Sequence, residues 1–177
     1  RDERRSDVPD SSSEREWRSR FAKKYARCEP GHGSEQDFET IEELRTALEK
    51  TRFGLISAGR NPKRETDLDE EFFLERHERL RQDLTAGGYV FTQVLGRYGD
   101  YEDSFLVMAH DADREDLIRL GKTYNQDSVI FCDRGKNQMI YTTDSTDDDG
   151  NPIAAGSYLQ GEGYKEVGGD EENYFTE

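Results

Sequence analysis

The chain has 177 residues, of which 32% are hydrophobic and 37% are charged, and its formal net charge is −15 at pH 7. This length suits one domain with extensions. So acidic a chain is a poor general partner for nucleic-acid phosphates or an anionic membrane. No transmembrane or signal-peptide pattern stands in the sequence. We therefore expect a protein that is cytoplasmic or packaged inside a larger assembly, with other proteins as its partners.

Residues 1–36 are predicted to form a basic N-terminal arm that ends in a linker. Residues 1–29 carry nine Lys and Arg against seven Asp and Glu. The SSSE sequence has capping-box spacing, which predicts a helix from Glu14 to about Arg27. Three aromatic side chains would share one side of this helix, namely Trp17, Phe21 and Tyr25. This stripe predicts either a clasp on the domain itself or an anchor in a partner's groove.

Residues 37–143 are predicted to form the α+β core domain. Apolar periodicity and turn residues give the elements in chain order: a helix at 41–51, a strand at 53–57, a helix at 69–88, strands at 89–96 and 104–109, a helix from about 111 to 124, and strands at 128–133 and 138–143. From the first strand the order is β-α-β-β-α-β plus one extra strand. It predicts a ferredoxin-like split βαβ fold, with an antiparallel sheet and two helices on one face.

Residues 144–177 are predicted to form an acidic, glycine-rich C-terminal extension. They carry one Lys against ten Asp and Glu, and such a composition forms a core poorly. The acidity fits adaptation to high salt or an interaction tail. It also leaves open an inhibitor that imitates nucleic acid.

Three polar loops should meet at one end of the predicted sheet. Right-handed crossovers and an antiparallel hairpin bring together residues 57–65, 96–103 and 124–128. We call this surface the loop rim, and its candidate partner-binding residues are Ser57, Arg60, Asn61, Arg97, Tyr98, Tyr101, Asn125 and Gln126. Arg and Tyr anchor many interfaces. The competing interpretation is that these residues only form turns.

The sequence offers few signs of catalytic or metal-binding chemistry. The two cysteines and three histidines are scattered, unlike a zinc site. His77 shares the spacing of Phe73, Leu80 and Leu84, which predicts a histidine packed in the core. DSTDDDGN lacks the terminal acid of a calcium loop, and no nucleotide-binding glycine motif or nucleophile elbow is present. We therefore assign no catalytic residue, metal or cofactor, and lean away from an enzyme.

Four stretches carry a resemblance to a known family: SAGRNP, HERLRQDLTAGGY, GRYGDYEDSFLV and LGKTYNQDSVI. Together they resemble a family of small uncharacterised α+β proteins of bacteria and tailed viruses, from about Phe53 to Thr143. The resemblance implies no particular activity. It favours a viral or mobile-element setting.

The interpretation that we favour from the sequence is a non-enzymatic assembly protein, for example a virion component from a salt-tolerant host system. Its two arms would contact neighbours, and the N-terminal arm would do so through Trp17, Phe21 and Tyr25. The alternative is a small enzyme or ligand-binding domain at the loop rim, with Arg60 and Arg97 holding an anionic group and Asn61, Tyr98 or Gln126 orienting it.

Overall fold

The computed structural model describes residues 28–36, 41–98, 100–109, 113–134, 136–147, 149–156, 158–161 and 174–176. The predicted helix at 14–27, with Trp17, Phe21 and Tyr25, lies outside these ranges. Within them, no helix has the length and apolar character needed to cross a membrane.

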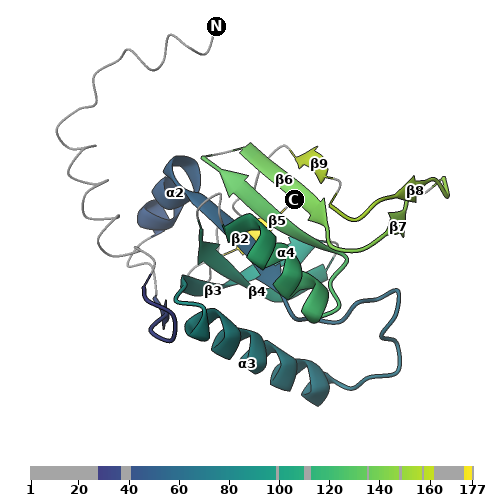
Figure 1. Ribbon diagram of the computed structural model, residues 1–177, viewed down its shortest axis with the longest axis horizontal. Coiled ribbons are helices and arrows are strands. Elements are labelled where there is room, and N and C mark those ends of the chain that lie inside the picture. Colours follow the sequence, from purple (N-terminus) through teal and green to yellow (C-terminus); the bar gives the residue numbers. More distant parts are fainter. Residues whose placement is uncertain are drawn as a thin grey trace, which may run out of the picture.

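The described elements form a mixed α+β fold (Figure 1). The helices are α2 (Ile41–Lys50), α3 (Glu70–Ala86) and α4 (Arg114–Thr123). The strands are β1 (Ser34–Glu35), β2 (Arg52–Ser57), β3 (Val90–Tyr98), β4 (Asp100–Met108), β5 (Ser128–Asp133), β6 (Lys136–Tyr141), β7 (Ser145–Thr146), β8 (Pro152–Ile153), β9 (Tyr158–Gly161) and β10 (Tyr174–Thr176).

The main sheet has the order β1-β3-β4-β2-β5-β6-β9, and β10 also pairs with β3. β1 and β10 run parallel to β3, whereas every other pairing in this sheet is antiparallel. The central order β3-β4-β2-β5 is that of a split βαβ unit. The ferredoxin-like α+β prediction is therefore confirmed, including the extra strand β6 beside β5.

Helices cover both faces of the sheet. Leu80 and Leu84 of α3 and Leu117 of α4 share one buried cluster with side chains of the central strands. Leu44 and Leu48 of α2 belong to a second cluster, which lies on the opposite strand face. Because successive strand side chains alternate between faces, the runs of apolar residues in β2 and β4 supply both clusters.

Local signals fix where the second helix starts and stops. The Asp69 side chain caps α3 by accepting a hydrogen bond from the Phe72 amide at 3.0 Å. The helix ends before Gly87 and Gly88, and Gly88 has a positive φ of 79°, a conformation that glycine adopts without steric cost. α3 therefore returns the chain directly into β3.

Two regions of strand extend beyond the sequence prediction. The β3–β4 hairpin continues its pairing out to Tyr98 and Asp100, whereas the sequence pattern placed a long loop at 96–103. β9 and β10 come from the acidic extension and pair with β6 and β3. Backbone pairing needs no apolar side chain, which is why hydrophobic periodicity overlooks such strands.

Candidate functional site

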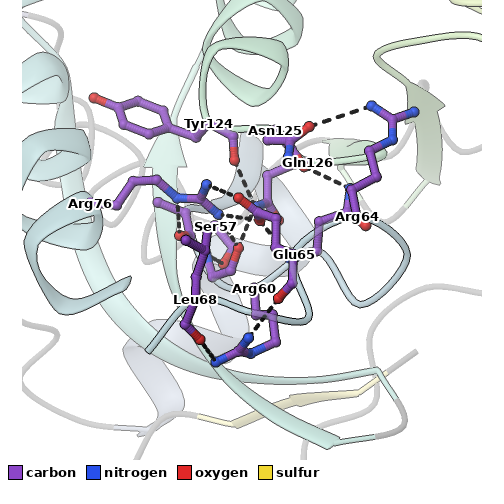
Figure 2. A network of polar contacts seen from close by, with 12 residues as sticks. Ser57, Arg60, Arg64, Glu65, Leu68, Arg76, Tyr124, Asn125 and Gln126 are labelled. Carbon is purple, nitrogen blue, oxygen red and sulfur yellow. Dashed lines mark hydrogen bonds and ion pairs between the residues drawn. The ribbon is translucent and has the colours of Figure 1, made fainter. Parts of the chain in front are cut away.

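Two of the loops that define the loop rim are joined by direct hydrogen bonds. The Asn61 side-chain amide donates to the Asn125 carbonyl at 2.8 Å. Gln126 donates through Nε2 to the Gly59 carbonyl at 2.8 Å (Figure 2). The segment after β2 is thus tied to the end of α4, as the predicted convergence requires.

A buried ion pair stands behind this segment. The guanidinium of Arg76, on α3, donates to both carboxylate oxygens of Glu65, at 2.6 and 2.9 Å. The two side chains are only 7% and 8% exposed. Arg76 also donates to the carbonyls of Ala58 and Gly59, at 2.8 and 2.5 Å. One side chain therefore holds the carboxylate and the backbone of the same loop.

The charge state of Glu65 follows from these contacts. Burial alone would raise the pKa of its carboxyl group. Hydrogen bonds from Arg76, the Asn61 amide and Asn125, with the charge of Arg76, outweigh burial and leave the pKa of Glu65 below its ordinary value. Glu65 is therefore held as a carboxylate paired with Arg76.

A second carboxyl group, Glu102 on β4, lies beside the end of β2. Ser57 pairs with Ser104 across the two strands, and Glu102 shares the face of Ser104 because it stands two residues before it. The Ser57 hydroxyl donates to Glu102 Oε1 at 2.6 Å and accepts from the Gly59 amide at 2.9 Å. A Cβ atom at Gly59 would lie 2.2 Å from the same Oε1. Glycine at position 59 therefore leaves room for the carboxyl group of Glu102.

Glu102 is half-buried, and its surroundings disfavour its charge. Burial is the main cause that raises the pKa of its carboxyl group above the ordinary value. The Ser57 hydrogen bond and the positive charge of Arg76 act in the opposite direction, and the negative charge of Asp103 adds to the rise. The result is a carboxylate that a cationic ligand would stabilise.

The remaining predicted residues of the loop rim are Arg60, in the segment after β2, and three residues of the β3–β4 hairpin. Arg60 donates to the carbonyls of Glu65 and Leu68, both at 2.6 Å, and its guanidinium lies 4.5 Å from the centre of the Phe73 ring. Its hydrogen bonds thus close its own loop (Figure 2). The backbones of three further residues lie near the tip of the β3–β4 hairpin, but their side chains are outside the described part: Arg97, Tyr98 and Tyr101.

Histidine supplies little to this site. His77 stacks on Phe105 with ring centroids 4.4 Å apart, and its Nε2 lies 3.4 Å from Gln93 Oε1. It is half-buried, whereas the buried residues of α3 are Phe73, Arg76, Leu80 and Leu84. Among the residues that the structure describes, no three His, Cys, Asp or Glu side chains are grouped to hold a metal ion.

Sequence reasoning assigned no role to the three charged residues at the centre of the site, Glu65, Arg76 and Glu102. Arg76 has the spacing of Phe73, Leu80 and Leu84, the other buried residues of α3. A charged residue on the apolar stripe of a helix is itself a sign of a buried pair, so this signal was present. Nothing comparable marks Glu65 or Glu102, because both stand among many solvated acids.

The fold and the site define a small α+β domain with a half-buried carboxyl group at one end of its sheet. The model of the S-adenosylmethionine lyase family matches residues 54–174. This match covers more than half of the chain and includes every side chain of the site, and the chain belongs to this family. No curated protein matches the sequence.

Family membership corrects the function inferred from the sequence. The favoured interpretation, a non-enzymatic virion or assembly protein, is wrong, because the family description indicates an enzyme-like function. The alternative of a small enzyme fits this finding better. The resemblance to a small protein family is confirmed, whereas its assignment to bacteria and tailed viruses stays a prediction.

Proposed function

We propose that this protein is an enzyme that cleaves a carbon–sulfur bond of S-adenosylmethionine, and that the site formed by Ser57 and Glu102 binds the substrate. Membership of the S-adenosylmethionine lyase family is the observation that carries this proposal. The carboxyl group of Glu102 supports it, since S-adenosylmethionine carries positive charge on its sulfonium and on its amino group. A half-buried carboxylate attracts such a ligand more strongly than one in bulk water does.

The chemistry of a lyase sets what the site must supply. When a carbon–sulfur bond of a sulfonium breaks, its electron pair leaves with sulfur as a neutral thioether. The carbon fragment then balances the reaction by closing a ring through its own carboxylate or by losing a proton, without added water. The protein's tasks are to bind the cation, hold one reactive conformer and exclude water.

Glu102 suits the binding task better than the bond-breaking task. Positive charge disappears from sulfur as the bond breaks, so a carboxylate beside the sulfonium stabilises the substrate more than the transition state. A carboxylate that contacts the amino group would stabilise both equally. In our proposal Glu102 contacts the amino group, and the Ser57 hydroxyl holds the carboxylate in place.

Incubation of the purified protein with S-adenosylmethionine tests the proposed activity. We expect loss of the substrate and formation of a thioether, followed by chromatography and mass spectrometry at short times. In water enriched in ¹⁸O, the first carbon product should lack the label. An intact substrate, or label in the earliest product, would contradict a lyase. Decarboxylated S-adenosylmethionine separates the two routes, because it can lose a proton but has no carboxylate through which to close the ring.

The pH dependence of the reaction should show the raised pKa of Glu102. The carboxylate form is lost as the pH falls through this pKa, so kcat/KM should decline on the acid side with an apparent pKa above that of an ordinary glutamate. Bound positive charge favours the carboxylate, so the acid limb of kcat should lie at lower pH than that of kcat/KM. If the acid limbs of kcat and kcat/KM coincide, or if both pH profiles are flat, Glu102 does not take part in substrate binding.

A further inference from the structure

Arg76 lies on α3, whereas the residues of the proposed substrate site, Ser57 and Glu102, lie on β2 and β4. Its side chain leaves the buried face of α3 and ends against the loop after β2 (Figure 2). The guanidinium donates to the carbonyls of Ala58 and Gly59 and to both oxygens of Glu65. Its planar set of donors matches all four acceptors at once, whereas a lysine ammonium has too few donors to do so.

The loop held by Arg76 also stands against the carboxyl group of Glu102. Glu65 accepts from the Asn61 amide at 2.8 Å, which closes the loop on itself. Gly59, whose carbonyl bonds Arg76, uses its amide to bond the Ser57 hydroxyl. The chain of contacts therefore runs from Arg76 through Gly59 and Ser57 to Glu102.

We propose that Arg76 is the positioning residue of the substrate site: by fixing the backbone of Ala58 and Gly59, it sets where the Ser57 hydroxyl and the Glu102 carboxyl group lie. This inference rests on the proposed function for its catalytic consequence. Its structural part, the placement of Ser57 and Glu102, can be tested whether or not the protein acts on S-adenosylmethionine.

The stability of the fold does not by itself explain why a buried ion pair such as Arg76–Glu65 is present. Removing two charges from water costs free energy, and well-packed apolar residues often replace such a pair with no loss. What apolar residues cannot reproduce is the set of hydrogen bonds to the two carbonyls. The charge of Arg76 makes a second contribution. Burial and the charge of Asp103 raise the pKa of Glu102, whereas the Ser57 hydrogen bond and the charge of Arg76 lower it.

Steady-state kinetics of Arg76→Lys test the catalytic consequence. Lysine keeps the positive charge but cannot hold four acceptors, and misplacement of a site by about 1 Å can cost about a hundredfold in rate. We expect kcat/KM to fall about a hundredfold, with a contribution from kcat. The matched control is Arg119→Lys, because Arg119 is 71% exposed in a surface pair with Asp116. An Arg76→Lys enzyme as active as this control would overturn the proposal.

Two measurements on the ligand-free protein test the placement directly. Amide exchange of Gly59 should be faster in Arg76→Lys than in the wild type, since the backbone that presents this amide to Ser57 is released. The double variant Arg76→Met/Glu65→Met removes the pair without leaving one charge buried, and it should remain folded. In it, carboxyl NMR should show the pKa of Glu102 raised further, whereas Arg76→Lys, which keeps the positive charge, should raise this pKa less.

The outcomes separate this inference from the proposed function. If the wild type leaves S-adenosylmethionine intact but Gly59 exchange and the Glu102 titration change as described, the proposed function fails and the positioning role stands. If the enzyme is active but both variants keep wild-type kcat/KM and Gly59 exchange, Arg76 is only a structural residue and the inference fails.

Discussion

Glu102→Gln should lower kcat/KM for S-adenosylmethionine about 30- to 1,000-fold, mainly through a higher KM. Glutamine keeps the shape of the side chain and can still accept the Ser57 hydrogen bond, but it removes the charge that would bind the cationic substrate. Loss of a close charge pair at a desolvated site costs about 2–4 kcal/mol. Steady-state kinetics at a pH above the acid limb of the wild type measure the effect.

The neighbouring carboxylate supplies the control for this substitution. Asp103 follows Glu102 on β4 but is exposed and lies on the other face of the strand. Asp103→Asn should therefore retain most of the activity, and it should shift the acid limb to lower pH because the charge of Asp103 raises the pKa of Glu102. If Glu102→Gln and Asp103→Asn behave alike, Glu102 has no special role in binding.

Glu65→Ala should destabilise the fold by about 3–5 kcal/mol, because it leaves the guanidinium of Arg76 buried without its counter-charge. Chemical denaturation, followed by circular dichroism, gives the free energy of unfolding. The double variant Arg76→Met/Glu65→Met is the comparison, and it should recover most of the loss. A single variant that is as stable as the double variant would show that solvent reaches Arg76 and satisfies its charge.

The same pair predicts how acid affects the wild-type fold. The folded-state pKa of Glu65 lies below its ordinary value, so the folded protein binds the proton less tightly than the unfolded chain does. The stabilisation from Glu65 is thus fully present above the unfolded-state pKa and is lost as the pH falls through the folded-state pKa. Glu102 contributes in the opposite sense, because its folded-state pKa is raised.

Much of the fold follows from the pattern of apolar residues. The prediction for β5 matches residue by residue, and α3 was found through its apolar stripe and the glycines that follow it. The convergence of loops was also predictable, because the order of elements and the handedness of crossovers determine which ends of the strands meet. Asn61 and Gln126, both predicted members of the loop rim, do make the contacts that join two of its loops.

The chemistry of the site was less accessible to sequence reasoning. Whether a carboxyl group is buried beside another strand depends on register, and Glu102 is one acid among 40 Asp and Glu. Gly59 could be read as a turn glycine, and only the structure shows that it stands opposite the carboxyl group of Glu102. In so acidic a chain, the role of an individual carboxylate therefore depends on which residues lie beside it in the fold.

Strand β3 bears on how copies of this protein behave at high concentration. An uncovered outer strand offers its amides and carbonyls to other molecules and favours aggregation. Here β1 lies along Val90–Phe91 and β10 along Leu95–Arg97, so two segments far apart in the sequence cover the same outer strand at different points. Deleting either segment would expose only part of that strand, and shortened forms of the protein that are intended to remain dispersed should retain both.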